Sequence, residues 1–161
     1  VDRFSLYMMR TLVMAIQNSS MLYDVGLEQP SDCLNYRTVI SRIERIADHA
    51  ALIADRIKFL KEPLEPKLLK ELESLSESAV ACFENSISAL TKKDHILAEK
   101  VAANIIQVIE KEKELMYAMK ESKHSTIVKF TLEDIRRTAE YSSDIIETVV
   151  NETIREIISE K

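Results

Sequence analysis

A single glycine, Gly26, is the feature of this 161-residue chain that most limits its fold. At an average usage of about 7%, a chain of this length would carry about eleven glycines. Dinucleotide-binding and phosphate-binding loops need several glycines, and all-β domains need glycine and proline at many turns. Only three prolines add to these chain breakers, namely Pro30, Pro63 and Pro66. The sequence therefore predicts an all-α protein of long helices joined by few loops.

Length, composition and charge indicate one globular domain. The chain is long enough to bury about 68–70% of its unfolded surface, and 46% of its residues are hydrophobic. The formal net charge of −5 argues against nucleic-acid binding by this segment, because such domains usually carry a basic surface. No apolar run approaches the ~18 residues of a membrane span. Cys33 and Cys82 match no metal-ligand spacing, so we expect buried free thiols and a cytoplasmic location.

Apolar residues recur at helical spacing in five segments, which predicts an antiparallel helical bundle. We expect residues 18–32 to form a loop, and Thr91 to cap the fourth helix. The expected helices are 2–22, 33–60, 67–90, one that follows the Thr91 cap and continues to about residue 121, and one that begins between 125 and 131 and ends near 158.

The first two helices and the last two look like copies of one hairpin. The third helix precedes the second copy, whereas the chain begins at Val1 with no counterpart before the first copy. We therefore expect a single domain built as a tandem three-helix repeat, and a fragment of a longer protein. Residues 1–62 would be a partial first repeat that lacks its first helix, and residues 63–161 a second, complete repeat.

An acidic stripe follows the rim of the apolar face in two of these helices. With ~100° of rotation per residue, Glu44 and Asp48 fall in one narrow sector beside Ile40 and Ala47. The last helix repeats this geometry with Glu140 and Asp144. Two carboxylates four residues apart are neighbours on a helix and repel each other, so each pair needs compensation.

Arginines or a metal cation can supply that compensation. Arginines lie close in sequence to both pairs, and such ion pairs on a solvated helix face are worth a few tenths of a kcal/mol. The other source is a hard cation, which oxygen-only ligands favour. On neighbouring helices, Asp2 can join the first pair, and Glu110 or Glu114 can join the second. We expect His49 to be a solvated residue near Arg45 and Arg56.

Three strings in the chain resemble the PhoU family of phosphate-uptake regulators. RIERIADHAALIADRI, preceded by Tyr36-Arg37, resembles the signature helix of that family. VDRFSLYMMRTL, with Asp2 and Arg10, resembles the helix that precedes it. RRTAEYSSDIIE resembles the archaeal-type variant of the second copy.

The resemblance implies a helical protein whose paired acidic motifs bind iron, zinc, manganese or magnesium. It assigns one site to Asp2, Glu44 and Asp48. It assigns a second to Glu140 and Asp144 with Glu110 or Glu114. It also implies a protein that represses phosphate transport or signalling through phosphate ABC transporter components or a signalling partner. DNA contact would belong to a domain before Val1.

We expect a homodimer without catalytic activity, because no nucleophile–base arrangement occurs in the sequence. Three alternatives remain open. The first is a non-catalytic dimerisation module of a transcription regulator, and the second is an accessory subunit of a low-affinity phosphate transporter. The third is a di-metal carboxylate enzyme, although such bundles need paired Glu-x-x-His motifs and the chain has one, at Glu121 and His124.

Overall fold

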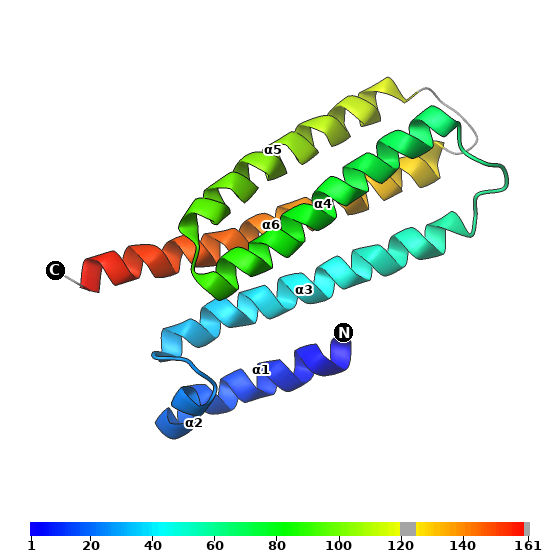
Figure 1. Ribbon diagram of the computed structural model, residues 1–161. Coiled ribbons are helices and arrows are strands. Elements are labelled where there is room, and N and C mark those ends of the chain that lie inside the picture. The colour runs from blue at the N-terminus through cyan, green and yellow to red at the C-terminus, as the bar shows by residue number, and fades with distance from the viewer. Residues whose placement is uncertain (120–124, 160–161) are drawn as a thin grey trace.

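The structure is a computed structural model that describes residues 1–119 and 125–159, with side chains described as far as Asn151. Six helices follow one another in this part of the chain, and no strand occurs among the described residues (Figure 1). The prediction of an all-α helical bundle is therefore confirmed. The helices are α1 (Asp2–Gln17), α2 (Ser19–Asp24), α3 (Pro30–Ile57), α4 (Pro66–Lys92), α5 (His95–Ala118) and α6 (Ser125–Ser159).

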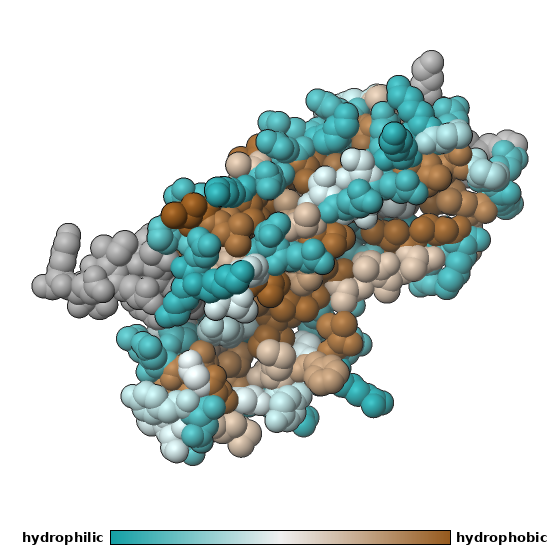
Figure 2. All heavy atoms as spheres, viewed as in Figure 1, coloured by the Kyte–Doolittle hydropathy of each residue, from teal (hydrophilic) through white to brown (hydrophobic). Residues whose placement is uncertain are grey.

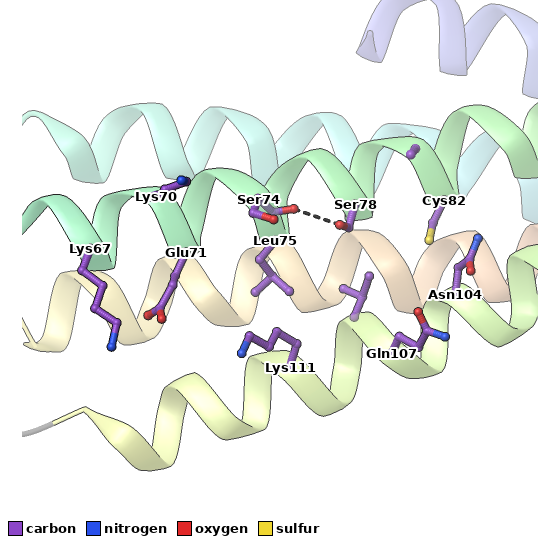
Figure 3. Close-up of a pocket in the computed structure, with 12 residues that line it drawn as sticks. Lys67, Lys70, Glu71, Ser74, Leu75, Ser78, Cys82, Asn104, Gln107 and Lys111 are labelled. Carbon is purple, nitrogen blue, oxygen red and sulfur yellow. Dashed lines mark hydrogen bonds between the residues drawn. The ribbon is translucent and has the colours of Figure 1, made fainter.

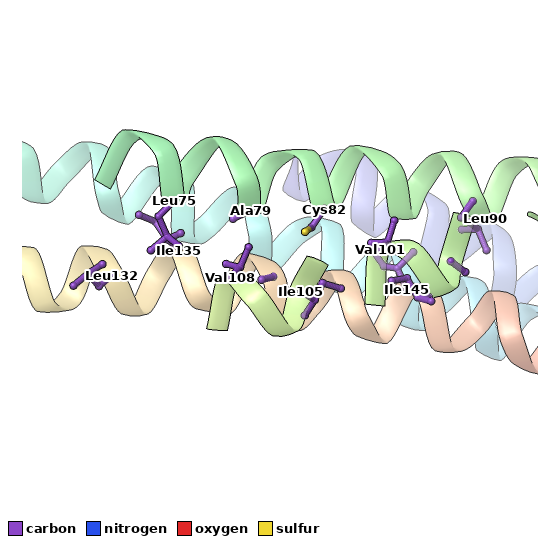
Figure 4. Close-up of a cluster of buried hydrophobic side chains, with 14 of the residues drawn as sticks. Leu75, Ala79, Cys82, Leu90, Val101, Ile105, Val108, Leu132, Ile135 and Ile145 are labelled. Atoms are coloured by element: carbon purple, nitrogen blue, oxygen red, sulfur yellow. The ribbon is translucent and has the colours of Figure 1, made fainter. Parts of the chain in front are cut away.

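Helix α6 is the centre of a four-helix bundle formed by α3 to α6. It contacts α3, α4 and α5, and α4 also contacts α5. The core between these helices is apolar, and Leu132 and Ile145 of α6 are completely buried in it together with Val101 of α5 (Figure 4). Consecutive long helices run antiparallel, so α3 and α6 also run in opposite directions (Figure 1).

Helix α1 lies outside this bundle and packs mainly on α3 and α2. A second, smaller core joins them, built from Leu12 and Ala15 of α1, Leu22 of α2, and Cys33 and Ile40 of α3. The remaining apolar side chains of α1 are largely exposed, for example Phe4 at 76% and Tyr7 at 70%, and apolar surface is visible over α1 in the lower part of Figure 2.

The predicted single helix over residues 2–22 is wrong, because the chain breaks at Asn18. This residue has an extended backbone (φ −139°, ψ 107°). Its side-chain oxygen accepts hydrogen bonds from the amides of Ser20 at 3.0 Å and Met21 at 3.4 Å. Asparagine is among the best residues for capping a helix N-terminus in this way, so a new helix, α2, starts where we expected a loop.

Gly26 ends α2 in the left-handed conformation, with φ +76°. Its amide donates to the Tyr23 carbonyl at 2.9 Å, and the Leu27 amide donates to the Leu22 carbonyl at 3.0 Å. This pair of hydrogen bonds is the Schellman motif, which favours glycine because it has no Cβ. The single glycine of the chain thus closes a helix end and turns the chain toward α3.

Two other helix starts differ from the prediction. Helix α3 begins at Pro30 rather than near residue 33, because the Asp32 carboxylate accepts from the Gln29 amide at 2.9 Å and so satisfies a free donor at the helix start. Asp94, rather than Thr91, caps α5 by accepting from the Leu97 amide at 2.9 Å. Thr91 lies inside α4.

The division into two three-helix repeats stays a prediction. Among the described residues, no helix is both long enough and apolar enough to cross a lipid bilayer. The predicted end of the fourth helix near residue 121 lies outside the described residues, whereas α5 ends at Ala118.

Candidate functional site

The first predicted ligand set lies at one end of the α1–α3 pair. The Ser5 hydroxyl of α1 donates to the Glu44 carboxylate of α3 at 2.7 Å. The two helices run antiparallel (Figure 1). The residue one turn before Ser5 in α1 and the residue one turn after Glu44 in α3 therefore lie on the same side of this hydrogen bond. Asp2 and Asp48 occupy those positions and are both exposed, whereas Glu44 is half-buried. The fold therefore brings these three acidic residues to one end of the pair.

These three carboxylates have no basic partner in the described part of the chain. No Lys, Arg or His residue there forms an ion pair with any of them. No group of three metal-ligating side chains is close enough among the described residues to hold an ion as the side chains stand. Asp2 and Asp48 would have to turn toward Glu44 to share a cation, which their exposure allows. The chemistry this corner offers is oxygen-only coordination of a hard cation.

The second acidic pair, on α6, is neutralised by arginines. Glu140 pairs with Arg136 and with Arg137, the latter at 3.1 Å. Asp144 pairs with Arg42 of α3 at 2.5 Å. The ion-pair alternative from the sequence thus describes the arrangement around this copy, and a metal ion would have to displace the arginine contacts.

The structure does not bring Glu110 or Glu114 into a described contact with the α6 pair. Both side chains are exposed on α5, and Glu114 pairs with Lys111 at 3.3 Å. The residue between them, Glu112, is the buried one, 3% exposed, and its carboxylate lies 3.8 Å from the Arg136 guanidinium.

The sequence carried a signal for Glu112 that we missed. The buried positions of α5 recur three or four residues apart, and Glu112 continues this series between Val108 and Leu115. Burial raises the pKa of the Glu112 carboxyl, and this effect outweighs the lowering by the Arg136 charge. The carboxyl therefore keeps its proton to a higher pH than an exposed glutamate does.

A polar seam joins α3 to α6. Arg42, His49 and Arg56 are spaced seven residues apart on α3, so they lie on one face of that helix. The ring Nδ1 of His49 hydrogen-bonds to the Asp134 carboxylate at 2.8 Å, and the Arg56 guanidinium pairs with the same carboxylate. Asp134 is 3% exposed. The prediction that His49 is a solvated residue is wrong, because α6 covers this face of α3.

Aromatic rings complete the seam on the α6 side. The Tyr141 ring lies beneath the Arg42 guanidinium, at 5.4 Å, and 5.7 Å from the His49 ring. The Phe130 ring lies 5.1 Å from the Arg56 guanidinium. Burial lowers the pKa of His49, and the positive charges of Arg137, Arg56 and Arg45 lower it further. We interpret the seam as the contact that sets the register of α3 against α6.

Comparison of the chain with protein-family models, with curated proteins and with solved structures finds no match in any of the three.

Proposed function

We propose that this chain is a non-catalytic regulator of phosphate uptake that works as a metal-dependent interaction module. The sequence of α3, which resembles the PhoU signature helix, supports the proposed role in phosphate uptake. One structural contrast supports the metal site. The Glu140–Asp144 pair has three arginine neighbours, whereas the Glu44–Asp48 pair has a hydroxyl as its hydrogen-bond partner among the described residues.

The metal ion would act by changing the charge of one surface. Asp2, Glu44 and Asp48 are acidic residues of like charge, and their carboxylates repel one another at the end of the α1–α3 pair. A divalent cation, with manganese, iron, zinc and magnesium as the candidates, would remove most of that repulsion and hold α1 on α3. A component of the phosphate ABC transporter, or a signalling partner, would then bind this stabilised surface, and a second copy of the chain is a further expected partner.

Metal content tests the site directly. We expect the purified chain, dialysed against each of the four metals, to retain metal when it is measured by mass spectrometry. The double variant Glu44→Gln/Asp48→Asn should lose it. Glu73→Gln/Glu77→Gln is the matched control, because it removes two exposed carboxylates four residues apart from α4 and should bind as the wild type does. A wild type that retains no metal, or an α3 variant that binds as the control does, would overturn the metal site.

Phosphate uptake tests the biological role. Cells of the source organism that lack the gene should take up radiolabelled phosphate faster than cells that express the wild-type protein. Expression of Glu44→Gln/Asp48→Asn should fail to restore repression, while the α4 control variant restores it. Equal uptake with and without the gene, under both high and low phosphate, would refute the proposed role.

A further inference from the structure

A groove of about 760 Å³ runs between α4 and α5, on a part of the molecule remote from the α1–α3 corner (Figure 3). Its floor is apolar and formed by the buried side chains of Leu75, Cys82 and Val108. The α4 wall stays open because small residues, among them Ser74 and Ser78, line it. The Ser78 hydroxyl donates to the Ser74 carbonyl at 2.9 Å within the helix, so its oxygen can still accept a hydrogen bond.

The two ends of the groove differ in chemistry. Lys67 lies at one end on the α4 wall, and Lys111 lies on the α5 wall below Leu75 (Figure 3). Glu71, the one carboxylate that lines the groove, lies between the two lysines in this view. Lys67 is also in the first turn of α4, where the helix dipole favours an anion. Toward the other end lie the side-chain amides of Asn104 and Gln107 (Figure 3).

The basic end is unusual for this chain. The protein as a whole carries a net charge of −5, yet the groove is lined by three lysines, Lys67, Lys70 and Lys111, against the single carboxylate of Glu71. Lys111 pairs with Glu114, which does not line the groove, at 3.3 Å, and this exposed pair would open when Lys111 turns to an anion in the groove. A local excess of positive charge in an acidic protein selects anionic ligands by attraction at short range and by repelling cations. The volume of the groove falls within the roughly 300–1,000 Å³ of small-molecule sites.

We propose that this groove binds an organic phosphate of the nucleotide class. The ammonium groups of Lys67 and Lys111 hold the phosphates, and the flat organic body lies on Leu75 and Val108. Inorganic phosphate would leave this apolar floor without a partner, and a fatty acid would leave the amides of Asn104 and Gln107 without one. A nucleotide has all three parts, namely charged phosphates, a flat body with apolar faces, and a polar edge that hydrogen-bonds to amides.

Binding to the intact chain tests this proposal, and calorimetry is the method because the chain has no tryptophan. The probes are ATP, adenosine and tripolyphosphate, with EDTA present so that no metal bridges protein and phosphate. We expect ATP to bind, and adenosine and tripolyphosphate each to bind at least about tenfold more weakly, since each lacks one part of the contact. No binding of ATP, or equal affinity for tripolyphosphate, would overturn the proposal.

Variants locate the site. Lys67→Gln/Lys111→Gln should weaken ATP binding about tenfold or more, the loss of charge-assisted hydrogen bonds. The control Lys58→Gln/Lys129→Gln removes two exposed lysines, one directly after the C-terminal end of α3 and one on α6, and should leave the affinity unchanged. Ser78→Phe places a ring in the groove and should abolish binding while the helical circular dichroism stays the same. Equal affinities of the lysine variant and its control would refute the assignment. Because EDTA is present, this result does not depend on the proposed metal site.

Discussion

The strongest stability prediction concerns Asp134, the buried carboxylate at the α3–α6 seam. Replacement by alanine removes the hydrogen-bond partner of His49 at 2.8 Å and the ion-pair partner of Arg56. Both lose their carboxylate partner on α6, while α6 still covers much of their surface. Removing one member of a buried ion pair is far more costly than the pair is stabilising, because the remaining charge stays desolvated.

The magnitude follows from burial. Breaking a fully buried pair costs about 3–5 kcal/mol. The side chains of His49 and Arg56 keep 20% and 25% of their exposure, so water can partly solvate them after the substitution. We therefore expect the free energy of unfolding to fall by about 2–3 kcal/mol, in the range for one lost hydrogen bond to a charged group.

Urea unfolding followed by circular dichroism measures this loss. Asp134→Asn should fall between wild type and alanine, because an amide oxygen can still accept from His49. The matched control is Asp55→Asn, which removes an exposed aspartate that pairs with Lys58 on α3 and should leave the unfolding midpoint unchanged. If Asp134→Ala unfolds at the same urea concentration as this control, the seam does not hold α3 on α6 and the argument fails.

Four further predictions concern single side chains. Asp94→Ala removes the cap of α5 and should lower the free energy of unfolding by about 1 kcal/mol, measured by urea unfolding. Leu132→Ala leaves a cavity at a fully buried site and should cost about 2–5 kcal/mol by the same measurement; a loss below 1 kcal/mol would contradict its central place. Burial raises the pKa of the thiols of Cys33 and Cys82, so iodoacetamide at pH 8 should label neither in the folded protein and both in urea. The raised pKa of Glu112 means that the folded state binds the Glu112 proton more tightly than the unfolded chain does. The stability that this proton contributes is therefore lost as pH rises through the pKa of the folded state. The stability of Glu112→Gln relative to wild type should increase from pH 4 to pH 8, and parallel stability curves would contradict this.

Helical spacing was enough to predict the long helices. The limits of α4 agree with the expected 67–90 to within two residues, because Pro66 starts the helix and apolar positions continue along it. The short helix after Asn18 was missed because Asn18, Ser19 and Ser20 are residue types that favour caps and turns over helix interiors, which led to the prediction of a loop from residue 18. Only the cap contacts from Asn18 to Ser20 and Met21 show that the chain restarts there.

The environment of polar residues was harder to predict than the helices. A helical wheel places His49 near the arginines of its own helix, but it cannot say which second helix will cover that face. Asp134 lies 85 positions away in the sequence, and the contact depends on how α3 and α6 are aligned along their length. The burial of Glu112 could have been predicted from helical periodicity, because its neighbours in the buried series are Val108 and Leu115.

The two copies of the Glu-x-x-x-Asp motif show why the motif alone does not define a site. In α6 the motif lies on the helix that three others surround, so arginines both from α3 and from α6 itself meet its carboxylates. In α3 the motif faces α1, which offers Ser5 to Glu44. Identical spacing therefore leaves one pair neutralised within the fold and the other without a basic partner among the described residues. The identity of the neighbouring helix, rather than the motif, decides which copy keeps the arginine-free carboxylates that the proposed metal site needs.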